Sequence, residues 1–142
     1  FQGLAGLFII NDLEEATLNL PSGRFEIPLV IQDKRLTNQG ITYNPTAEEV
    51  MSGYMGESVL VNGIYSPYTE VSTRYYRLRI LNGSNARLYN LAFSNNADMI
   101  IIGNDGGLLK NPVTVKEILL APGERLDVLV SFNGLSIGTE LF

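Results

Sequence analysis

Apolar residues follow two patterns along this chain, strict alternation with polar residues and short unbroken runs. The alternating segments are residues 75–80, 88–93 and 125–131. In the first of them, Tyr76 and every second residue after it point to one face, while Arg77 and Arg79 point to the other. We expect the apolar face to lie in a core and the arginine face to lie outward. The pattern therefore predicts strands that bury one face only.

Four further segments are apolar almost throughout, which is typical of strands that are buried on both faces. They are residues 27–31, 58–61, 99–102 and 118–120. We expect these strands to form the layer on which the alternating strands pack, so that two sheets face each other. Residues that tolerate positive φ separate the strands, namely Asn62-Gly63, Asn82-Gly83, Asp105-Gly106-Gly107 and Pro122-Gly123. Together the patterns predict an all-β sandwich, with its clearest hairpin at Asn62-Gly63.

One short helix is expected within this sandwich. Thr46 is a helix-capping residue, and Glu49 stands three residues later, as in a capping box. The helix should end near Gly53, because glycine commonly follows the last helical residue.

The two ends of the chain differ from its middle. Residues 4–10 have the pattern of a strand, and the polar segment that follows breaks at Pro21-Ser22-Gly23. The sequence begins without Met, and residues 138–142 resemble the start of a strand, so we interpret the chain as a piece of a longer protein. We predict three parts: residues 1–12 as the last strand of a preceding domain, 13–25 as a linker, and 26–142 as a second domain truncated at its C-terminal end.

Composition excludes several kinds of chemistry. The 142 residues contain no histidine and no cysteine, so the usual nitrogen and sulfur ligands of copper and zinc are missing. Only carboxylates, carbonyl groups and the thioethers of Met51, Met55 and Met99 remain. Mechanisms that use a Ser-His-Asp triad, a Cys-His pair or a histidine base are excluded as well. We therefore predict no catalytic residue and no metal ligand in this chain.

Charge and hydropathy exclude two further classes of partner. The net charge is −5, and the ten basic residues are scattered except for Arg74, Arg77 and Arg79. A nucleic-acid surface needs a contiguous basic patch, so we expect no nucleic-acid partner. The longest wholly apolar run is four residues, which is too short to cross a bilayer, so we expect no membrane span.

Six short phrases then occur in a particular order over nearly the whole chain. They are GLAGL at 3–7, PLVIQD at 28–33, LVNG at 60–63, RLRILN at 77–82, DGGLL at 105–109 and APGER at 121–125. In this order they resemble the junction of domains one and two, and then domain two, of three-domain multicopper oxidases. Laccases of the spore-coat type and periplasmic cuprous oxidases carry closely similar phrases.

The resemblance implies a Greek-key β-sandwich of the cupredoxin type for residues 26–142. It also implies a parent protein in which this domain lies between cupredoxin domains one and three. The resemblance further implies that the parent is secreted or periplasmic and that it carries four copper ions outside this region. In such enzymes a mononuclear copper takes electrons from a phenolic, pigment or metal-ion donor. A trinuclear cluster between domains one and three then reduces oxygen to water. The ligands are histidines in His-x-His motifs and one cysteine, which lie upstream and downstream of the region covered here.

Two other hypotheses stay open. The same phrases occur in a copper-free periplasmic relative that serves as a scaffold in cell division, and the segments 32–36 and 65–68 resemble that relative strongly. Asp105-Gly106-Gly107 matches the active enzymes better, and we favour the enzyme. A free-standing binding module is the third hypothesis. It is disfavoured because the chain begins and ends within segments that have the pattern of strands.

Four groups of residues are candidates for a site. The resemblance places Met55 and Gly56 near the surface depression where electron donors dock, so Met55 is a candidate wall of a substrate pocket; a methionine that merely fills a gap is the plainer interpretation. The arginines at 74, 77 and 79 could bind an anion, although a solvated or domain-facing surface is the default. Asp105 is expected to cap a turn, and Asn82-Gly83-Ser84, which fits a glycosylation sequon, is expected to be a turn.

Overall fold

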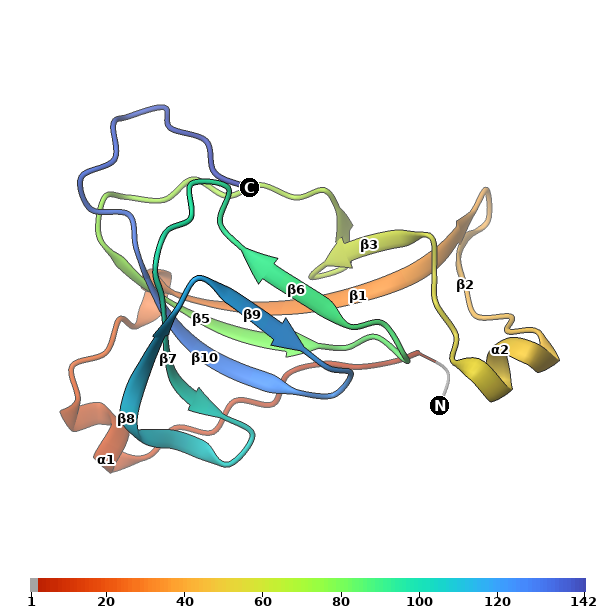
Figure 1. The fold of residues 1–142 in the computed structure, drawn as a ribbon, viewed down its shortest axis with the longest axis horizontal. Helices are drawn as coiled ribbons and strands as arrows, with labels where there is room; N and C mark the ends of the chain where they lie inside the picture. Colours follow the sequence, from red (N-terminus) through yellow and green to blue (C-terminus); the bar gives the residue numbers. More distant parts are fainter. Residues whose placement is uncertain (1–2) are drawn as a thin grey trace.

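The structure of this protein, a computed structural model, describes residues 3–142 and consists mainly of β-strands (Figure 1). The helices are α1 (Leu13–Thr17), a single 3₁₀ turn (Gly23–Phe25) and α2 (Ala47–Ser52). The strands are β1 (Glu26–Thr37), β2 (Gly40–Thr42), β3 (Ser58–Val61), β4 (Ile64–Tyr65), β5 (Tyr75–Asn82), β6 (Tyr89–Ala92), β7 (Met99–Asn104), β8 (Gly107–Val115), β9 (Glu117–Leu120) and β10 (Arg125–Ser131).

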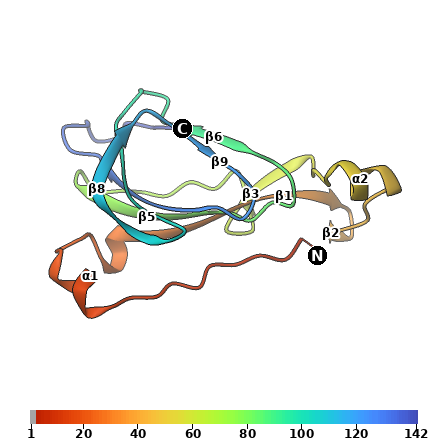
Figure 2. The same ribbon diagram turned by 60° about the horizontal axis from the view of Figure 1, so that its bottom comes forward.

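These strands form two sheets that pack face to face. The larger sheet has the order β4-β3-β1-β5-β10-β7-β8, with β2 attached to β1, and the smaller one pairs β6 with β9. Strands β1 and β5 are parallel, and the other pairs are antiparallel. Figure 2 shows the β6–β9 layer lying over one face of the larger sheet. The predicted all-β sandwich is therefore confirmed.

The core lies between these two sheets. From the small sheet, Ile118 and Leu120 of β9 are 3% and 0% exposed, and they meet Val128 of β10, which is also fully buried. Tyr76 and Ile80 of β5 belong to the same cluster, as the alternating pattern predicts. Because β5 and β10 pair antiparallel with Leu78 opposite Val128, their apolar residues lie on one face of the sheet.

The division of strands between the layers differs from the prediction. Segments 27–31, 58–61 and 99–102 share the larger sheet with the alternating strands at 75–80 and 125–131, and only 118–120 lies in the other layer. Two of the apolar runs are also not buried on both faces, because Val59 is 39% exposed and Leu119 is 68% exposed. Strand β3 lies near an edge of its sheet, and β9 belongs to a two-stranded sheet whose outer face is uncovered.

The predicted hairpin and helix are both confirmed. Asn62 and Gly63 join β3 to β4 with φ values of 51° and 79°, as a turn with two positive φ angles requires. Thr46 accepts a hydrogen bond from the Glu49 N–H at 3.2 Å, and the Glu49 carboxylate accepts one from the Thr46 N–H at 2.7 Å. The helix ends at Gly53, whose φ of 108° favours glycine.

Residues 4–10, predicted as part of the last strand of a preceding domain, belong to neither sheet, and Phe1 and Gln2 lie outside the described residues; the assignment to a preceding domain stays a prediction. The segment is extended but forms no strand, because no neighbouring strand within residues 3–142 pairs with it. Leu4 and Phe8 are accordingly 83% and 90% exposed. Figure 2 shows the segment running beneath the larger sheet toward α1.

The predicted linker also contains a second α-helix, α1, which the sequence analysis missed. Asp12 caps it by accepting a hydrogen bond from the Glu15 N–H at 2.7 Å. An aspartate followed three residues later by a glutamate is the pattern that could have predicted this helix.

Candidate functional site

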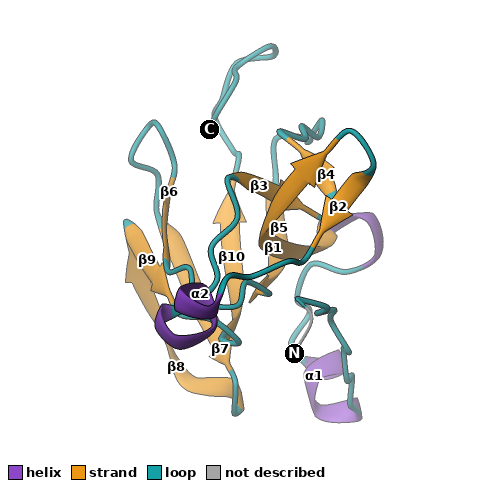
Figure 3. Ribbon diagram, turned by 90° about the vertical axis from the view of Figure 1, so that its right-hand side faces the viewer, coloured by secondary structure: helices purple, strands orange, loops and turns teal. Residues whose placement is uncertain are grey.

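The segment predicted to meet a substrate is the loop between α2 and β3. Tyr54 in this loop is 3% exposed, and its ring packs edge-on against Tyr43 with 4.9 Å between centroids. The guanidinium of Arg35 lies over the same ring, 5.2 Å from its centroid. Met55 follows and is 50% exposed. Met55 is therefore exposed to solvent next to Tyr54, whose ring is buried. Helix α2, immediately before this loop, lies at one end of the molecule in Figure 1 and in front of the sheets in Figure 3, which is viewed from that end.

Both backbone polar groups of Gly56 form hydrogen bonds with one ion pair, Asp33 and Arg87. Its N–H donates to Oδ2 of Asp33 at 2.7 Å, and its carbonyl accepts from Nη2 of Arg87 at 2.8 Å. Arg87 also donates through Nε to the same Asp33 oxygen at 3.0 Å. A Cβ at position 56 would lie 2.3 to 2.5 Å from the backbone atoms of Lys34. Only glycine therefore fits this approach of two backbones.

A buried polar network continues from Asp33 to the turn after β5. The Asp33 N–H donates to the Ser84 hydroxyl at 3.0 Å, and the Ser84 N–H donates to Oδ1 of Asn82 at 3.0 Å. The Asn82 amide donates to the carbonyls of Arg87 and Leu120. Because Asn82 is fully buried and its amide is engaged, the sequon at 82–84 is a turn and not a glycosylation site.

Tyr89 closes this network on the side of the small sheet. Its hydroxyl lies 2.9 Å from the Ser84 hydroxyl. Burial raises the pKa of Tyr89, and the negative charge of Asp33 acts in the same direction, while the hydrogen bond to Ser84 opposes both. The phenol is therefore neutral at physiological pH and serves as a hydrogen-bonding group of the network.

Helix α2 is tied to β1 by a second ion pair. Nη2 of Arg35 lies 2.8 Å from Glu49 and its Nε lies 3.3 Å from Glu57, on either side of the Met55 loop. The Thr46 N–H and the Arg35 side chain lower the pKa of Glu49. Charged Glu49 therefore fixes the helix that precedes the loop.

We expect the stability contributed by Glu49 to be lost in acid. A carboxylate whose pKa is lowered by folding stabilises the folded state above its ordinary value of 4.5, and this contribution disappears as the pH falls through the lowered pKa. Unfolding midpoints in urea should therefore fall less steeply between pH 5 and about pH 3 in Glu49→Gln than in the unsubstituted protein. The matched control is Glu48→Gln, on the same helix. Parallel curves for all three proteins would contradict this prediction.

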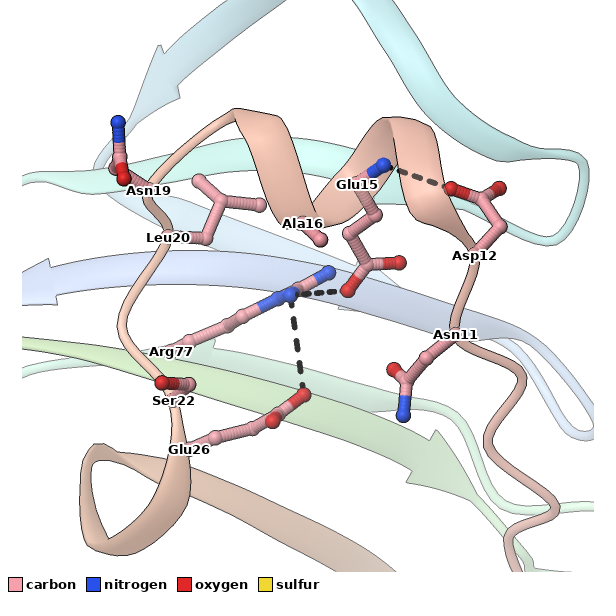
Figure 4. Close-up of a pocket in the computed structure, with 9 residues that line it drawn as sticks. All are labelled: Asn11, Asp12, Glu15, Ala16, Asn19, Leu20, Ser22, Glu26 and Arg77. Atoms are coloured by element: carbon pink, nitrogen blue, oxygen red, sulfur yellow. Dashed lines mark hydrogen bonds and ion pairs between the residues drawn. The ribbon is translucent and has the colours of Figure 1, made fainter.

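The arginines at positions 77 and 79 are engaged by the protein's own carboxylates. Figure 4 shows Arg77 with Glu15 and Glu26. Arg77 contacts Asp127 and Glu15, both at 2.5 Å, and it is 3% exposed. Arg79 contacts Glu15, Glu26 and Asp127 at 2.7, 2.8 and 3.1 Å. The predicted outward, solvated face is therefore wrong for Arg77, because α1 and its carboxylate cover it. The anion-site hypothesis has no support, because the two guanidinium groups are already neutralised.

Arg77 keeps its charge although it is buried. Burial alone would lower its pKa, but the hydrogen bonds from its guanidinium to Asp127 and Glu15 more than reverse this effect, so the pKa of Arg77 is raised. These residues come from β5, β10 and α1. The ion pairs consequently attach the N-terminal segment to the larger sheet.

Two cavities flank this attachment. One of about 470 Å³ lies between α1 and the sheet and is lined by Glu15, Glu26 and Arg77 among others (Figure 4). The second, of about 710 Å³, lies between α1 and the β7–β8 turn and is lined by Arg79 and Asp127 among others. Neither cavity includes Met55 or Gly56. The substrate-pocket role of those two residues stays a prediction.

The remaining candidates have structural roles. Asp105 accepts a hydrogen bond from the Arg125 N–H at the start of β10 at 2.8 Å, whereas its own turn is capped by Asn104, whose Oδ1 accepts from the Gly106 N–H at 3.0 Å. Arg74 lies over the ring of Phe25, 3.9 Å from its centroid. No helix among the described residues is long and apolar enough to cross a membrane.

The described residues do not fit a copper site. Within residues 3–142 no three or more carboxylate, histidine or cysteine side chains are arranged to hold a metal ion. The three carboxylates around Arg77 and Arg79 are occupied by those arginines. Of the thioethers, Met99 is 4% exposed in the core, while Met51 is 89% exposed on α2.

Comparison with known proteins assigns the chain to a family. A family profile described as "Multicopper oxidase" matches residues 32–139. This chain belongs to the multicopper oxidase family. The laccase of Bacillus subtilis is 41% identical over 94% of the chain, and the cell division protein FtsP of Yersinia pestis is 43% identical over 94%. The chain spans 28% of the length of each of these two relatives.

Solved structures of the family share this fold. A variant of the McoA multicopper oxidase of Aquifex aeolicus has a TM-score of 0.80 and 44% identity, covering 89% of this chain and 29% of that one. The laccase of Pediococcus acidilactici has a TM-score of 0.84 and 37% identity, covering 92% and 28%. The predicted family and the predicted cupredoxin-type sandwich are therefore confirmed.

Sequence reasoning missed the residues that anchor the Met55 loop. Asp33 lies in β1, two residues after the apolar run at 27–31, and Arg87 lies 54 positions later. A carboxylate inside an apolar strand needs a partner, and that requirement was the available signal. The identity of the partner could not be obtained from the spacing.

Proposed function

We propose that this chain is the middle, copper-free domain of a three-domain multicopper oxidase that oxidises an electron donor and reduces oxygen to water. The observation that carries the proposal is 41% identity to a laccase over 94% of a chain whose own side chains do not fit copper. We infer further that residues 1–12 are the last strand of the preceding cupredoxin domain, which would account for the exposed apolar side chains of Leu4 and Phe8. The parent would carry four copper ions in its other two domains.

The role of the domain in this proposal is mechanical. A metal cluster shared by two domains needs those domains held within a fraction of an ångström. The sandwich at 26–142 would serve as the rigid spacer between them, and Met55 would form one wall of the donor pocket. A secreted or periplasmic location belongs to the same proposal.

The experiment uses the full-length protein. We expect it to bind copper and to oxidise a chromogenic phenol with consumption of oxygen. Deletion of residues 26–142 should abolish copper loading of the cluster between the flanking domains, measured by metal analysis and absorption spectroscopy. Normal oxygen consumption after the deletion would sink the proposal.

A copper-free scaffold is the second candidate. It is favoured by 43% identity to FtsP, a value close to the identity with laccase. The roughly twenty residues upstream of this chain distinguish the two candidates, because an intact His-x-His motif there predicts copper and its replacement predicts the scaffold. Metal analysis of the full-length protein gives the same answer independently.

A further inference from the structure

We propose that Asn133 is a site of spontaneous modification, at which the side-chain amide reacts with the backbone of Gly134 and is converted to aspartate and isoaspartate. The sequence contains three Asn-Gly pairs, at 62–63, 82–83 and 133–134. The fold holds the first two in place and leaves the third open to reaction. This inference concerns the chain itself and does not depend on the proposed oxidase function.

The reaction sets three structural requirements. The backbone nitrogen of Gly134, after losing its proton to a base in the solvent, attacks Cγ of Asn133. A bond forms between these two atoms, the bond from Cγ to Nδ2 breaks, and Nδ2 leaves as ammonia. Water then opens the resulting succinimide ring at either of its carbonyl groups, without any change in oxidation state. The amide must therefore be free to turn, the attacking N–H must be free to lose its proton, and water must have access.

Glycine as the second residue makes the attack easier, because it has no Cβ to hinder the approach of its nitrogen. All three pairs share this advantage, so the sequence alone ranks them equally. The difference between them lies in the hydrogen bonds that the folded chain makes at each position.

Asn82 meets none of the three requirements. It is 0% exposed, and its Nδ2 donates to the carbonyls of Arg87 and Leu120 at 2.8 and 2.9 Å. The N–H of Gly83, which would have to attack, donates to the carbonyl of Ile31 at 2.8 Å. Reaction at this pair therefore requires the larger sheet to open beside β1 and β5.

Asn62 is accessible to water, but its side chain is held. It belongs to the turn between β3 and β4, where its Oδ1 accepts from the Val30 N–H at 2.8 Å and its Nδ2 donates to the Pro28 carbonyl at 2.9 Å. Its backbone N–H donates to the Val30 carbonyl at 2.9 Å. The amide is thus bonded along β1, and Cγ cannot turn toward Gly63 until both side-chain bonds break.

Asn133 meets all three requirements. It follows the end of β10, and both Asn133 and Gly134 are exposed. Within residues 3–142 neither the side-chain amide of Asn133 nor the N–H of Gly134 forms a hydrogen bond. The turn is closed by the Leu135 N–H, which donates to the Phe132 carbonyl at 3.4 Å, a long and therefore weak bond. A Cβ built on Gly134 meets no atom within 4 Å, so the space around the attacking nitrogen is open.

The products differ from the starting protein in ways that can be measured. Either product adds one negative charge to a chain whose net charge is −5. Isoaspartate also routes the backbone through the side-chain carbon and so lengthens it within the turn. The variant Asn133→Asp supplies the aspartate product as a standard. Isoaspartate is then the peptide that has the same mass as this standard and a different elution time.

The test is incubation of the full-length protein in mildly alkaline buffer, followed by digestion and peptide mapping by mass spectrometry. We expect the converted fraction at Asn133 to grow at least about tenfold faster than at Asn62 or Asn82, since several hydrogen bonds must open before either of those amides can react. Both aspartate and isoaspartate should appear at position 133. Conversion at Asn62 or Asn82 as fast as at Asn133 would overturn the proposal.

The same protein in concentrated guanidinium chloride is the matched control. Unfolding breaks the bonds that hold Asn62 and Asn82, so the three rates should agree within about threefold. An excess at Asn133 that persists after unfolding would show that its neighbours in sequence, and not the fold, set the rate. An Asn133 that reacts in the unfolded protein but stays intact in the folded one would show that the turn protects it. Either result overturns the inference.

Discussion

Replacing Arg77 by methionine should lower the free energy of unfolding by about 3 to 5 kcal/mol, the range found when one partner of a buried ion pair is removed. Arg77 is 3% exposed and lies 2.5 Å from both Asp127 and Glu15. Asp127 is itself 6% exposed, so the substitution leaves a buried carboxylate with only Arg79 beside it. Urea denaturation of the chain, followed by circular dichroism, measures the change directly.

The control for this prediction is an arginine that pairs with a carboxylate at the surface. Arg125 lies 3.1 Å from Asp105, and both side chains are about half exposed. Arg125→Met should therefore cost less than about 1 kcal/mol. Equal losses in the two variants would show that the burial of Arg77 contributes nothing to its effect.

Replacing Gly56 by alanine should lower the free energy of unfolding almost as much as replacing Arg77 by methionine. In Gly56→Ala the new Cβ would lie 2.3 to 2.5 Å from the backbone N, C and O of Lys34, in the middle of β1. Backbone cannot rotate away as a flexible side chain can, so the strand or the loop must move and the contacts to Asp33 and Arg87 lengthen. We expect a loss of about 3 kcal/mol, at the upper end of the range for overpacking. The same denaturation experiment measures it.

Two other glycines provide the comparison. A Cβ at Gly6 meets no atom within 4 Å, and one at Gly106 meets only Oδ1 of Asn104 at 3.5 Å. Neither glycine has a positive φ. Alanine at these positions should leave the stability unchanged or raise it by a few tenths of a kcal/mol, because it restricts the unfolded chain. A destabilisation at Gly6 as large as that at Gly56 would rule out the steric explanation.

The sequence predicts those features of the fold that depend on neighbouring residues. Alternation with a period of two identifies β5 and β10, and the capping box identifies α2, because both patterns act within a few positions. The pairing of strands is not local, and so the layer to which each apolar run belongs could not be predicted. The segment at 4–10 shows the same limit, because its residues favour a strand but the described chain offers it no neighbour.

In the candidate site, too, the sequence identified some residues but not their distant partners. A resemblance identified Met55 and Gly56, but the groups that hold them come from distant parts of the chain. Arg87 is 54 positions from Asp33, and Glu15 is 62 positions from Arg77. No periodicity connects such residues. Only the folded chain shows that Arg77, on the face of β5 predicted to lie outward, is one of the most deeply buried charged residues in residues 3–142.

The hydrogen bonds that join Gly56 to Asp33 and Arg87 also have an evolutionary consequence. Asp33, Gly56 and Arg87 depend on one another, so a lineage that changes one of them must change the others or lose the loop.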